Sequence, residues 1–288
     1  MPELPEVETI VRELSKQLPG KRIIDVQVRW PRLIAAPSPR AFCEQAIGLT
    51  IQEVTRRGKF ILISLPPLSL LIHLRMSGQL LLVSEDTPAD KHVHVIWRFS
   101  SDEALFYRDV RKFGRLYLVR DPQAILAGLG PEPLSSEFTP QRLAELLRGQ
   151  RRQIKPLLMD QHTLAGLGNI YTDESLWLAG IHPKRRAGSL TPSEIQRLHQ
   201  AIRQVLWNAI QHKGTTLRDF RDPHNGAGEN QFSLAVYGHQ GEPCPRCGHP
   251  IERDLIGGRG THFCPLCQPL GGPQGEKEQS DEHREAIP

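Results

Sequence analysis

The chain has 288 residues, of which 39% are hydrophobic and 24% are charged. That balance is typical of a soluble globular protein, and the length allows two or three compact domains. No run of 18 apolar residues occurs, which excludes a membrane-spanning helix of ordinary length. The early acidic residues Glu3, Glu6 and Glu8 do not fit a secretory signal, so we expect a cytoplasmic protein.

The net charge of +4 is unevenly distributed along the chain. Residues 268–288 contain five acidic and two basic side chains, which leaves a net charge of +7 on the first 267 residues. A basic body favours a polyanionic partner such as a nucleic acid, although many basic proteins bind none. The tail is rich in Gly, Pro and Glu, and we expect it to be disordered.

The first half of the chain is expected to form one helix followed by a β-sandwich. Apolar residues recur at helical spacing through residues 3–18, before Pro19-Gly20 ends the pattern. Because no long helix interrupts the strand-like runs that follow, they favour an antiparallel sandwich or a flattened barrel over a parallel sheet. These runs cover residues 23–28, 60–65, 70–74, 79–83, 92–99, 104–109 and 114–119.

Helical patterns replace the β pattern after residue 133. Thr139-Pro140 fits a helix N-cap followed by proline. Thr191 and Glu194 have the spacing of a capping box, and the helix they open is expected to close at Lys213-Gly214. Shorter helical stretches are expected at 154–159 and 172–179, and a polar glycine-rich loop is expected at 221–231.

Four of the five cysteines form two CxxC pairs, Cys244 with Cys247 and Cys264 with Cys267, separated by sixteen residues. In an intracellular protein this spacing favours a four-cysteine zinc site on a β-hairpin over disulfides or free thiols. Thiolates would fill every ligand position, so the zinc is expected to be structural. Cys43 stands apart, and we expect it to be a buried apolar residue.

Arg259 lies between the two cysteine pairs, flanked by Gly258 and Gly260. An arginine displayed in this way can approach a phosphate group closely. It can equally be a solvated turn residue, and the spacing alone leaves both interpretations open.

Removal of Met1 would leave a chain that begins with the amine of Pro2. An α-amine has a pKa of about 8, against about 10.4 for lysine, so more of it is neutral at pH 7. A neutral amine is a competent nucleophile for carbonyl-type carbon, with Glu3 as acid or base and Lys59 as a second amine. The other interpretation is that Pro2 only starts a helix whose dipole the glutamates complement. Residue chemistry alone favours this second interpretation.

The order of the sequence motifs adds a stronger indication. Residues 2–268 resemble the formamidopyrimidine-DNA glycosylases, bacterial enzymes that excise oxidised purines. The opening PELPEVET (2–9) is followed in the family's order by RRGKF (56–60), IHLRMSGQL (72–80), KHVHV (91–95), RDVRKFG (108–114), GLGPEPL (128–134), IKPLLMDQ (154–161), GLGNIYTDESLWLAGIHP (166–183), GTTLRDF (214–220), VYGHQGEPCPRCG (236–248) and GRGTHFCPLCQ (258–268).

The resemblance implies an α+β fold of several domains, with DNA in the cleft between two lobes. We expect an N-terminal helix and β-sandwich in residues 1–133 and a helix-two-turns-helix DNA-binding domain in 134–230. A zinc-ribbon-like finger with the four cysteines is expected in 231–268 and the acidic tail in 269–288.

The implied activity is that of a bifunctional glycosylase and abasic-site lyase of base excision repair, with 8-oxoguanine and formamidopyrimidines as substrates. Pro2 would attack C1′ and form a Schiff base, while Glu3 would transfer protons. Lys59 corresponds to a lysine assigned to proton donation during β,δ-elimination. Arg259 corresponds to an arginine assigned to δ-elimination. Because a guanidinium stays protonated, we expect Arg259 to clamp the leaving phosphate.

The resemblance also implies how DNA is bound. Asn169 follows glycines at a helix start, where backbone N–H groups favour a phosphate. Glu6 is a candidate base-pocket residue. Met76, Arg111 and Phe113 correspond to residues that fill the gap left by a flipped base. Backbone-binding positions correspond to His92, Arg111, Lys155, Asn169, and either Arg151 or Arg152.

The departures from the family pattern are few. Arg75 stands where glycine is common, and Val110 interrupts the usual Asp-Pro-Arg. His73 and His94 are interpreted as structural rather than catalytic.

Two alternative functions agree less well with the sequence. Endonuclease VIII, a sister enzyme for oxidised pyrimidines, opens with Pro-Glu-Gly-Pro-Glu, whereas this chain has Leu4. A catalytically inert zinc-finger DNA-binding protein, or a ribosomal accessory factor, would need none of Pro2, Glu3 and Lys59. We therefore expect a monomer with one structural Zn²⁺, no organic cofactor and no membrane partner. Its partner is expected to be double-stranded DNA that contains oxidised bases or abasic sites.

Overall fold

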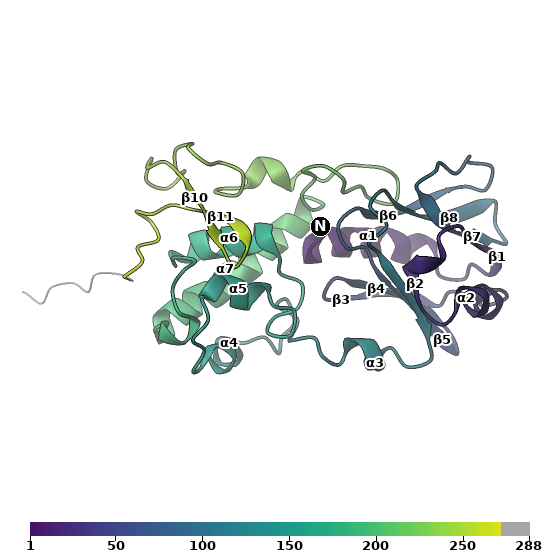
Figure 1. Ribbon diagram of the computed structural model, residues 1–288, viewed down its shortest axis with the longest axis horizontal. Helices are drawn as coiled ribbons and strands as arrows, with labels where there is room; N and C mark the ends of the chain where they lie inside the picture. Colours follow the sequence, from purple (N-terminus) through teal and green to yellow (C-terminus); the bar gives the residue numbers. More distant parts are fainter. Residues whose placement is uncertain (272–288) are drawn as a thin grey trace, which may run out of the picture.

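The computed structural model describes residues 1–271, and its N-terminal half is a β-sandwich with a helix running along it (Figure 1). The sheets have the strand orders β1-β7-β8-β6 and β2-β9-β5-β4-β3. Adjacent strands are antiparallel except for β2 and β9, which are parallel. The predicted sandwich is confirmed. Its elements are α1 (Leu4–Gln17), β1 (Ile23–Val28), β2 (Ile34–Ala36), α2 (Pro39–Ala46), β3 (Glu53–Arg57), β4 (Phe60–Leu65), β5 (Leu68–His73), β6 (Gly78–Ser84), β7 (Val93–Phe99), β8 (Glu103–Asp109) and β9 (Arg115–Val119).

Helix α1 belongs to both halves of the molecule. Its first residue, Leu4, packs in the core of the helical half, whereas Val7, Ile10 and Leu14 pack in the sandwich core. The helix contacts β3 on one side and α7 (Pro192–Gln211) on the other. Because one helix contributes to two hydrophobic cores, a change in the angle between the halves would expose apolar surface.

The helical half contains α4 (Pro140–Leu147), α5 (Ile154–Met159), α6 (Asn169–Ala179) and α7. A short helix, α3 (Gln123–Leu126), lies below the sandwich on the connection between the halves (Figure 1). The Oγ1 of Thr139 accepts a hydrogen bond from the backbone N–H of Arg142, as an N-cap does. At α7 the predicted capping box is confirmed. Thr191 Oγ1 accepts from the N–H of Glu194 at 3.3 Å, and Glu194 Oε2 accepts from the N–H of Thr191 at 2.8 Å.

The C-terminal finger is a two-stranded antiparallel hairpin, β10 (Glu252–Ile256) and β11 (Arg259–Phe263). It packs against α6, and its own hydrophobic core is small. The buried members of this core are Val236, Ile251, Cys244 and Cys264. So few buried apolar residues cannot hold a hairpin in place without another stabilising interaction.

Several elements were not predicted from the sequence. Helix α2 is a short helix with Ser38 as N-cap, β2 has three residues, and β3 buries only Val54, so their periodic patterns are weak. Helix α6 starts at Asn169 rather than at 172. The prediction that Cys43 is buried was wrong, because the residue is half-buried on α2 at the edge of the core.

The predicted loop at 221–231 runs into a 3-10 helix at Asn230–Ser233. Two further 3-10 helices cover Pro31–Leu33 and Ala187–Ser189. Of the predicted disordered tail, residues 272–288 lie outside the described residues. No helix in residues 1–271 combines the length and apolar character needed to cross a bilayer.

Thr191→Ala is expected to lower the free energy of unfolding by about 1 kcal/mol, because α7 loses its side-chain cap. Thr191→Ser keeps the hydroxyl and is expected to cost only a few tenths of a kcal/mol. Urea denaturation of both variants measures the difference. Equal losses from the two substitutions would show that the hydroxyl cap is not what stabilises the helix start.

Candidate active site

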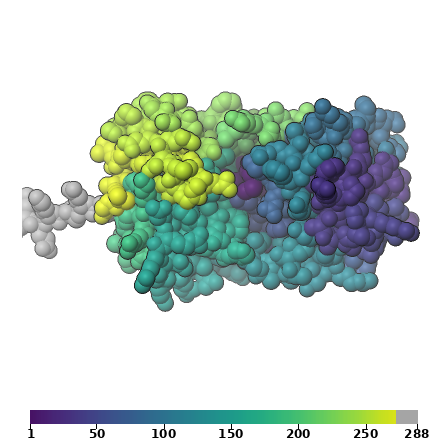
Figure 2. Space-filling view, viewed as in Figure 1, coloured from purple at the N-terminus to yellow at the C-terminus, as the bar shows by residue number. Residues whose placement is uncertain are grey.

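A cavity of about 340 Å³ opens where the two halves and the finger meet, beside the N-terminus marked in Figure 1. Its lining comes from the start of α1, the β5–β6 and β8–β9 turns, α6, residues 215–220 and the segment before the finger. In Figure 2 the yellow finger reaches the middle of the molecule, next to a small purple area from the start of the chain. Residues that are distant in sequence thus converge on one cavity. They include Pro2, Glu6, Met76, Arg111, Ile170, Thr215 and Tyr237.

Glu3 occupies the N-terminus of α6. Its Oε2 accepts a hydrogen bond from the N–H of Gly168 at 2.6 Å, and its Oε1 accepts one from the N–H of Ile170 at 2.9 Å. A Cβ atom at Gly168 would lie 2.4 Å from the Glu3 carboxyl carbon, so only glycine leaves room for this contact. The sequence predicted a phosphate at this helix start. The structure shows that a carboxylate of the protein binds these backbone N–H groups. A phosphate contact of Asn169 would therefore have to come from its side chain.

Lys59 is buried in the turn between β3 and β4, close to Glu3. Burial lowers the pKa of Lys59 and raises that of Glu3, while the attraction between the two charges opposes both shifts. The turn itself is held by Glu132, whose Oε2 accepts from Arg56 at 2.8 Å and whose Oε1 accepts from Arg57 at 3.0 Å. Burial thus brings the pKa values of the acid and the amine closer together, which favours proton exchange between them.

Glu6 is also buried, and both of its oxygens are hydrogen-bonded. Oε2 accepts from the N–H of Glu3 at 2.7 Å, and Oε1 accepts from the N–H of Thr215 at 2.8 Å and from the hydroxyl of Tyr171. Burial, together with repulsion from Glu3, raises the pKa of Glu6 to about 7. Glu6 therefore lines the cavity, as predicted for a base-pocket residue, and connects α1 to the segment that begins at Thr215.

Pro2 is buried at the bottom of the same cavity, and the half-exposed Met1 lies over it. The positive charge of the chain's N-terminus acts on Glu3 and lowers the pKa of its carboxyl, against the larger effect of burial. Removal of Met1 would place a secondary amine between Glu3 and the open cavity. Pro2 and Glu6 thus line the cavity. Glu3 lies behind this lining, hydrogen-bonded to Glu6 and close to the charge of Lys59.

Met76 and Arg111 line this cavity and are exposed, and the exposed Phe113 lies next to Arg111. The guanidinium of Arg111 lies 4.9 Å from the centre of the Phe113 ring, in a cation–π contact. Met76 and Phe113 count among the few large apolar side chains that remain exposed. Exposed apolar groups beside a cavity suit contact with a stacked partner such as a base.

Arg259 is exposed at the first position of β11, after a turn at Gly257-Gly258 in which both residues have positive φ. Its charge lowers the pKa values of Lys59 and Lys155. The finger therefore brings a permanent positive charge close to the buried acids. The structure brings Arg259 to the same site as Lys59, although the two are 200 positions apart in the sequence.

The predicted phosphate-binding residues differ in accessibility. His92 is half-buried, and Arg151 is exposed and forms no ion pair with any described residue. Arg152 pairs with Asp160 at 2.9 Å, so Arg151 is the freer of the two arginines. The side-chain amide of Asn169 donates to the carbonyl oxygen of Gly260 at 2.9 Å, which ties α6 to the finger.

Lys155 does not fit its predicted role as a phosphate contact. Its ammonium is fully buried, pairs with Asp173 at 2.7 Å and donates to the Oγ1 of Thr261 at 2.8 Å. It also donates to the carbonyl oxygen of Gly260, 3.2 Å away. A phosphate cannot reach this group in the observed conformation. Lys155 instead stabilises β11 through its hydrogen bonds to Gly260 and Thr261.

The four clustered cysteines fit a zinc ion. Their sulfur atoms lie within 4.8 Å of one another, with Cys244 and Cys267 separated by 3.9 Å and Cys247 and Cys264 by 3.5 Å. Tetrahedral ligands at about 2.3 Å from Zn²⁺ are roughly 3.8 Å apart. The indole N–H of Trp177 donates to the Cys244 sulfur at 3.4 Å. The finger therefore holds one structural zinc, whose ligands are these four thiolates.

Sequence analysis missed several residues of the site. Glu132, Tyr171, Thr215 and Asp109 hold functional side chains in place, although none lies next to them in the sequence. The motifs GLGPEPL, GLGNIYTDE, GTTLRDF and RDVRKFG contain these four residues. Their presence in family motifs was the available signal, but the motifs gave no role to them.

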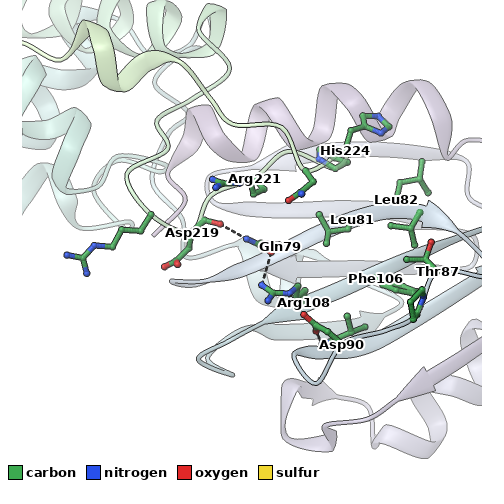
Figure 3. Close-up of a pocket in the computed structure, with 16 residues that line it drawn as sticks. Gln79, Leu81, Leu82, Thr87, Asp90, Phe106, Arg108, Asp219, Arg221 and His224 are labelled. Carbon is green, nitrogen blue, oxygen red and sulfur yellow. Dashed lines mark hydrogen bonds and ion pairs between the residues drawn. The ribbon is translucent and has the colours of Figure 1, made fainter.

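A larger cavity of about 680 Å³ lies on the face of β6 and β8 that points away from the sandwich core (Figure 3). The side-chain amide of Gln79 donates to the carbonyl oxygen of Asp219, and Arg108 donates to Gln79 Oε1 at 3.3 Å. The N–H of Leu82 donates to the carbonyl oxygen of Pro223 at 2.9 Å. The segment from 215 to 225 therefore separates the two cavities. Pro2 and Glu6 line the smaller cavity and not the larger one, so we assign the chemistry to the smaller.

Comparison with known families gives one consistent match. Residues 1–116 match the family model of the formamidopyrimidine-DNA glycosylase N-terminal domain, and residues 129–221 match the model of its H2TH domain. Residues 241–270 match a zinc finger found in FPG and IleRS. The three matches follow one another along the chain and span sandwich, helices and finger.

Two curated relatives extend the match to whole proteins. The formamidopyrimidine-DNA glycosylase of Herpetosiphon aurantiacus is 48% identical over 273 residues, which cover 93% of this chain and 100% of the relative. That of Symbiobacterium thermophilum is 47% identical over 274 residues, which cover 94% of this chain and 90% of the relative.

Solved structures show the same similarity. A complex between a Lactococcus lactis FPG mutant and DNA containing Fapy-dG has a TM-score of 0.88 at 41% identity, covering 93% of this chain and 100% of that one. MutM in complex with DNA containing carbocyclic 8-oxo-G has a TM-score of 0.87 at 42% identity, with coverage of 93% and 100%.

Cys247→Ser is expected to release the zinc and loosen the hairpin, because the finger has too small a core to fold without its metal. The matched control, Cys43→Ser, should keep one zinc per chain. Metal analysis combined with amide hydrogen exchange in β10 and β11 measures both effects. Metal-free protein with an equally protected hairpin would contradict the assignment.

Glu6 is expected to destabilise the protein as the pH rises. Because its pKa is raised from 4.5 to about 7, its stabilising contribution is complete below 4.5 and is lost as the pH rises through 7. Relative to Glu6→Gln, the wild type should lose up to about 3 kcal/mol of unfolding free energy between pH 4.5 and pH 8. Denaturation curves across this range test it, with Glu13→Gln on the same helix as control. If the difference in unfolding free energy between wild type and Glu6→Gln did not change with pH, the raised pKa of Glu6 would be refuted.

Proposed function

Because this chain belongs to the formamidopyrimidine-DNA glycosylase family, we propose that it excises oxidised purines from double-stranded DNA and then cuts the strand at the resulting abasic site. The relatives it resembles were solved with DNA that contains Fapy-dG, an abasic site or an 8-oxo-G analogue. The observation that carries the proposal is that Pro2 lines the cavity while its neighbour Glu3 is buried within reach of the Lys59 charge. The charge of the finger's Arg259 acts on the same Lys59. A binding protein would not need this group.

We propose Pro2 as the nucleophile. Without Met1, its secondary amine has the pKa of an α-amine, about 8, so part of it is neutral at physiological pH. The neutral amine attacks C1′ of the damaged nucleotide, and the bond from C1′ to the base breaks. The amine then loses its proton, and the bond from C1′ to the ring oxygen breaks as that oxygen takes up a proton. This opens the sugar and leaves an iminium ion, whose positive charge withdraws electrons from the sugar and prepares it for elimination.

Glu3 is proposed as the general acid and base of this step. Burial raises its pKa, so the carboxyl holds a proton more readily than an exposed glutamate does and can give it to the sugar ring oxygen or the leaving base. The two N–H groups at the start of α6 fix the orientation of the carboxyl. After the proton is transferred, the same N–H groups stabilise the carboxylate.

Lys59 and Arg259 are proposed to act in the elimination steps. The lowered pKa of Lys59 makes its ammonium a better proton donor than an exposed lysine. Arg259 stays protonated and therefore stabilises charge on the departing phosphates rather than transferring a proton. Loss of the 3′ phosphate and then of the 5′ phosphate leaves a gap of one nucleotide.

DNA binding is proposed to use the exposed side of the cleft. Met76, Arg111 and Phe113 fill the gap left by the flipped base, an exchange that offsets a flipping cost of a few kcal/mol. His92, Arg151 and Asn169 contact phosphates. We also propose that the protein acts in the bacterial cytoplasm, where the chromosome lies.

Borohydride trapping tests the proposal, because borohydride reduces the Schiff base to a stable protein–DNA bond. Wild-type protein should be trapped on 8-oxoguanine:C duplexes and far less on thymine-glycol duplexes. Pro2→Gly should abolish trapping but still bind a duplex with an abasic-site analogue, and Pro19→Gly, the same change at an exposed site, should behave as wild type.

Two results would overturn parts of this function. Undiminished trapping by Pro2→Gly would exclude Pro2 as the nucleophile and point to Lys59. Preferential trapping on thymine glycol would mean that the substrates are oxidised pyrimidines, as for endonuclease VIII.

A further inference from the structure

The side chains proposed to enter the duplex come from two separate turns. The β5–β6 turn, residues 74–78, carries Met76, and the β8–β9 turn, residues 109–114, carries Arg111 and Phe113. We refer to these two segments as the wedge turns. For all three side chains to fill one gap in a duplex, the wedge turns must keep a fixed position relative to each other.

One buried carboxylate connects the two wedge turns. Asp109 Oδ1 accepts a hydrogen bond from the hydroxyl of Ser77 in the first turn at 2.6 Å, and one from the N–H of Arg111 in the second at 3.1 Å. Its Oδ2 accepts from the N–H of Gly114 at 2.9 Å. Ser77 and Asp109 are 2% and 0% exposed, so neither is available to contact DNA.

Tyr107 lies beneath the same two turns. A Cβ atom at Gly114 would lie 1.6 Å from its hydroxyl oxygen, and a Cβ atom at Gly78 would lie 2.5 Å from it. Each wedge turn therefore needs its glycine to pack on this hydroxyl. Burial raises the pKa of Tyr107, so the hydroxyl stays protonated and can donate to Asp109 Oδ2, 3.4 Å away.

The backbone of both wedge turns depends on such contacts. Arg75 has φ 55° and Lys112 has φ 59°, in the left-handed region that non-glycine residues adopt only when neighbouring contacts enforce it. The ammonium of Lys112 lies 3.9 Å from the centre of the Trp30 ring, which holds the second turn from outside. Among the described residues, the hydrogen bonds of the Ser77 hydroxyl with Asp109 and with the N–H of Arg111 run directly from one turn to the other.

We propose that Asp109 is a positioning residue that locks the two wedge turns into one rigid unit, so that Met76 enters the duplex together with Arg111 and Phe113. The inference rests on the proposed function, in which these side chains replace a flipped base. Asp109 itself touches neither DNA nor the reacting atoms. Its role is to make insertion a single event rather than two independent ones.

The direct test follows insertion without requiring chemistry. The probe is a duplex in which 2-aminopurine neighbours a stable abasic-site analogue, because its fluorescence rises when neighbouring bases are unstacked. Asp109→Asn places an amide N–H₂ against the donors of Gly114 and Tyr107, and Ser77→Ala removes only the link between the turns. Both should slow the fluorescence rise at least about tenfold, which corresponds to roughly 1.4 kcal/mol in the barrier. The controls Asp121→Asn and Ser84→Ala make the same changes at exposed sites and should match wild type.

A double-mutant cycle tests whether the turns act as one unit. In the wild-type background, Met76→Ala and Phe113→Ala should affect the insertion rate non-additively, because either loss disables the shared wedge. In the Ser77→Ala background the two effects should become additive. Additive effects in both backgrounds would show that the turns insert independently and would overturn the inference.

Further outcomes separate this inference from the proposed function. Insertion at the wild-type rate in both Asp109→Asn and Ser77→Ala would refute the positioning role. If Ser77→Ala slowed insertion and also lowered the melting temperature, so that the slower insertion followed from the lost stability, the role of Asp109 would be only structural. A wild-type protein that inserts into the probe duplex but releases no 8-oxoguanine would remove the proposed function alone.

Discussion

The contact between the Glu3 carboxylate and the first turn of α6 joins the two halves of this protein at the site of the chemistry. It satisfies two backbone N–H groups that the helix leaves unpaired. It also places an acid next to Pro2 and within reach of the Lys59 charge. The same hydrogen bonds therefore serve the fold and the site, and Gly168 is required because any side chain there would displace the carboxylate.

The site depends equally on the exclusion of water. Glu3, Glu6 and Lys59 are all at least 96% buried, so burial raises the pKa values of the two acids and lowers that of the amine. Groups whose ordinary pKa values differ by about six units are brought closer together. The nearby charge of Arg259 comes from the finger, which depends on its zinc for a fixed position. A metal site that takes no part in the reaction thus contributes to the electrostatics of the reacting groups.

The sequence predicted the elements with strong periodicity and missed those that depend on distant partners. The seven strands, α1 and the capping box of α7 follow from spacing alone. By contrast, β2 has three residues, β3 buries only Val54, and α2 buries only Phe42 and Ala46, so their periodic patterns are weak. Burial is the main cause of the raised pKa of Glu6. Tyr171 and Thr215, which lie against Glu6, are 165 and 209 positions away, so no local pattern could predict this burial. Lys155 resembles an exposed cation in the sequence, yet Asp173 on α6 pairs with it and buries it. The domain limits inferred from the sequence stay a prediction.

Helix α1, shared by two cores, limits how far the cleft can open. Further hydrogen bonds cross between the halves. They join Glu3 to the start of α6, Arg56 to Glu132, and Gln79 to Asp219. A rotation of one half against the other would therefore break buried hydrogen bonds and expose apolar side chains of α1 at the same time. Because both costs fall on the protein, a partner that enters the cavity has to adapt its own shape to the protein rather than the reverse.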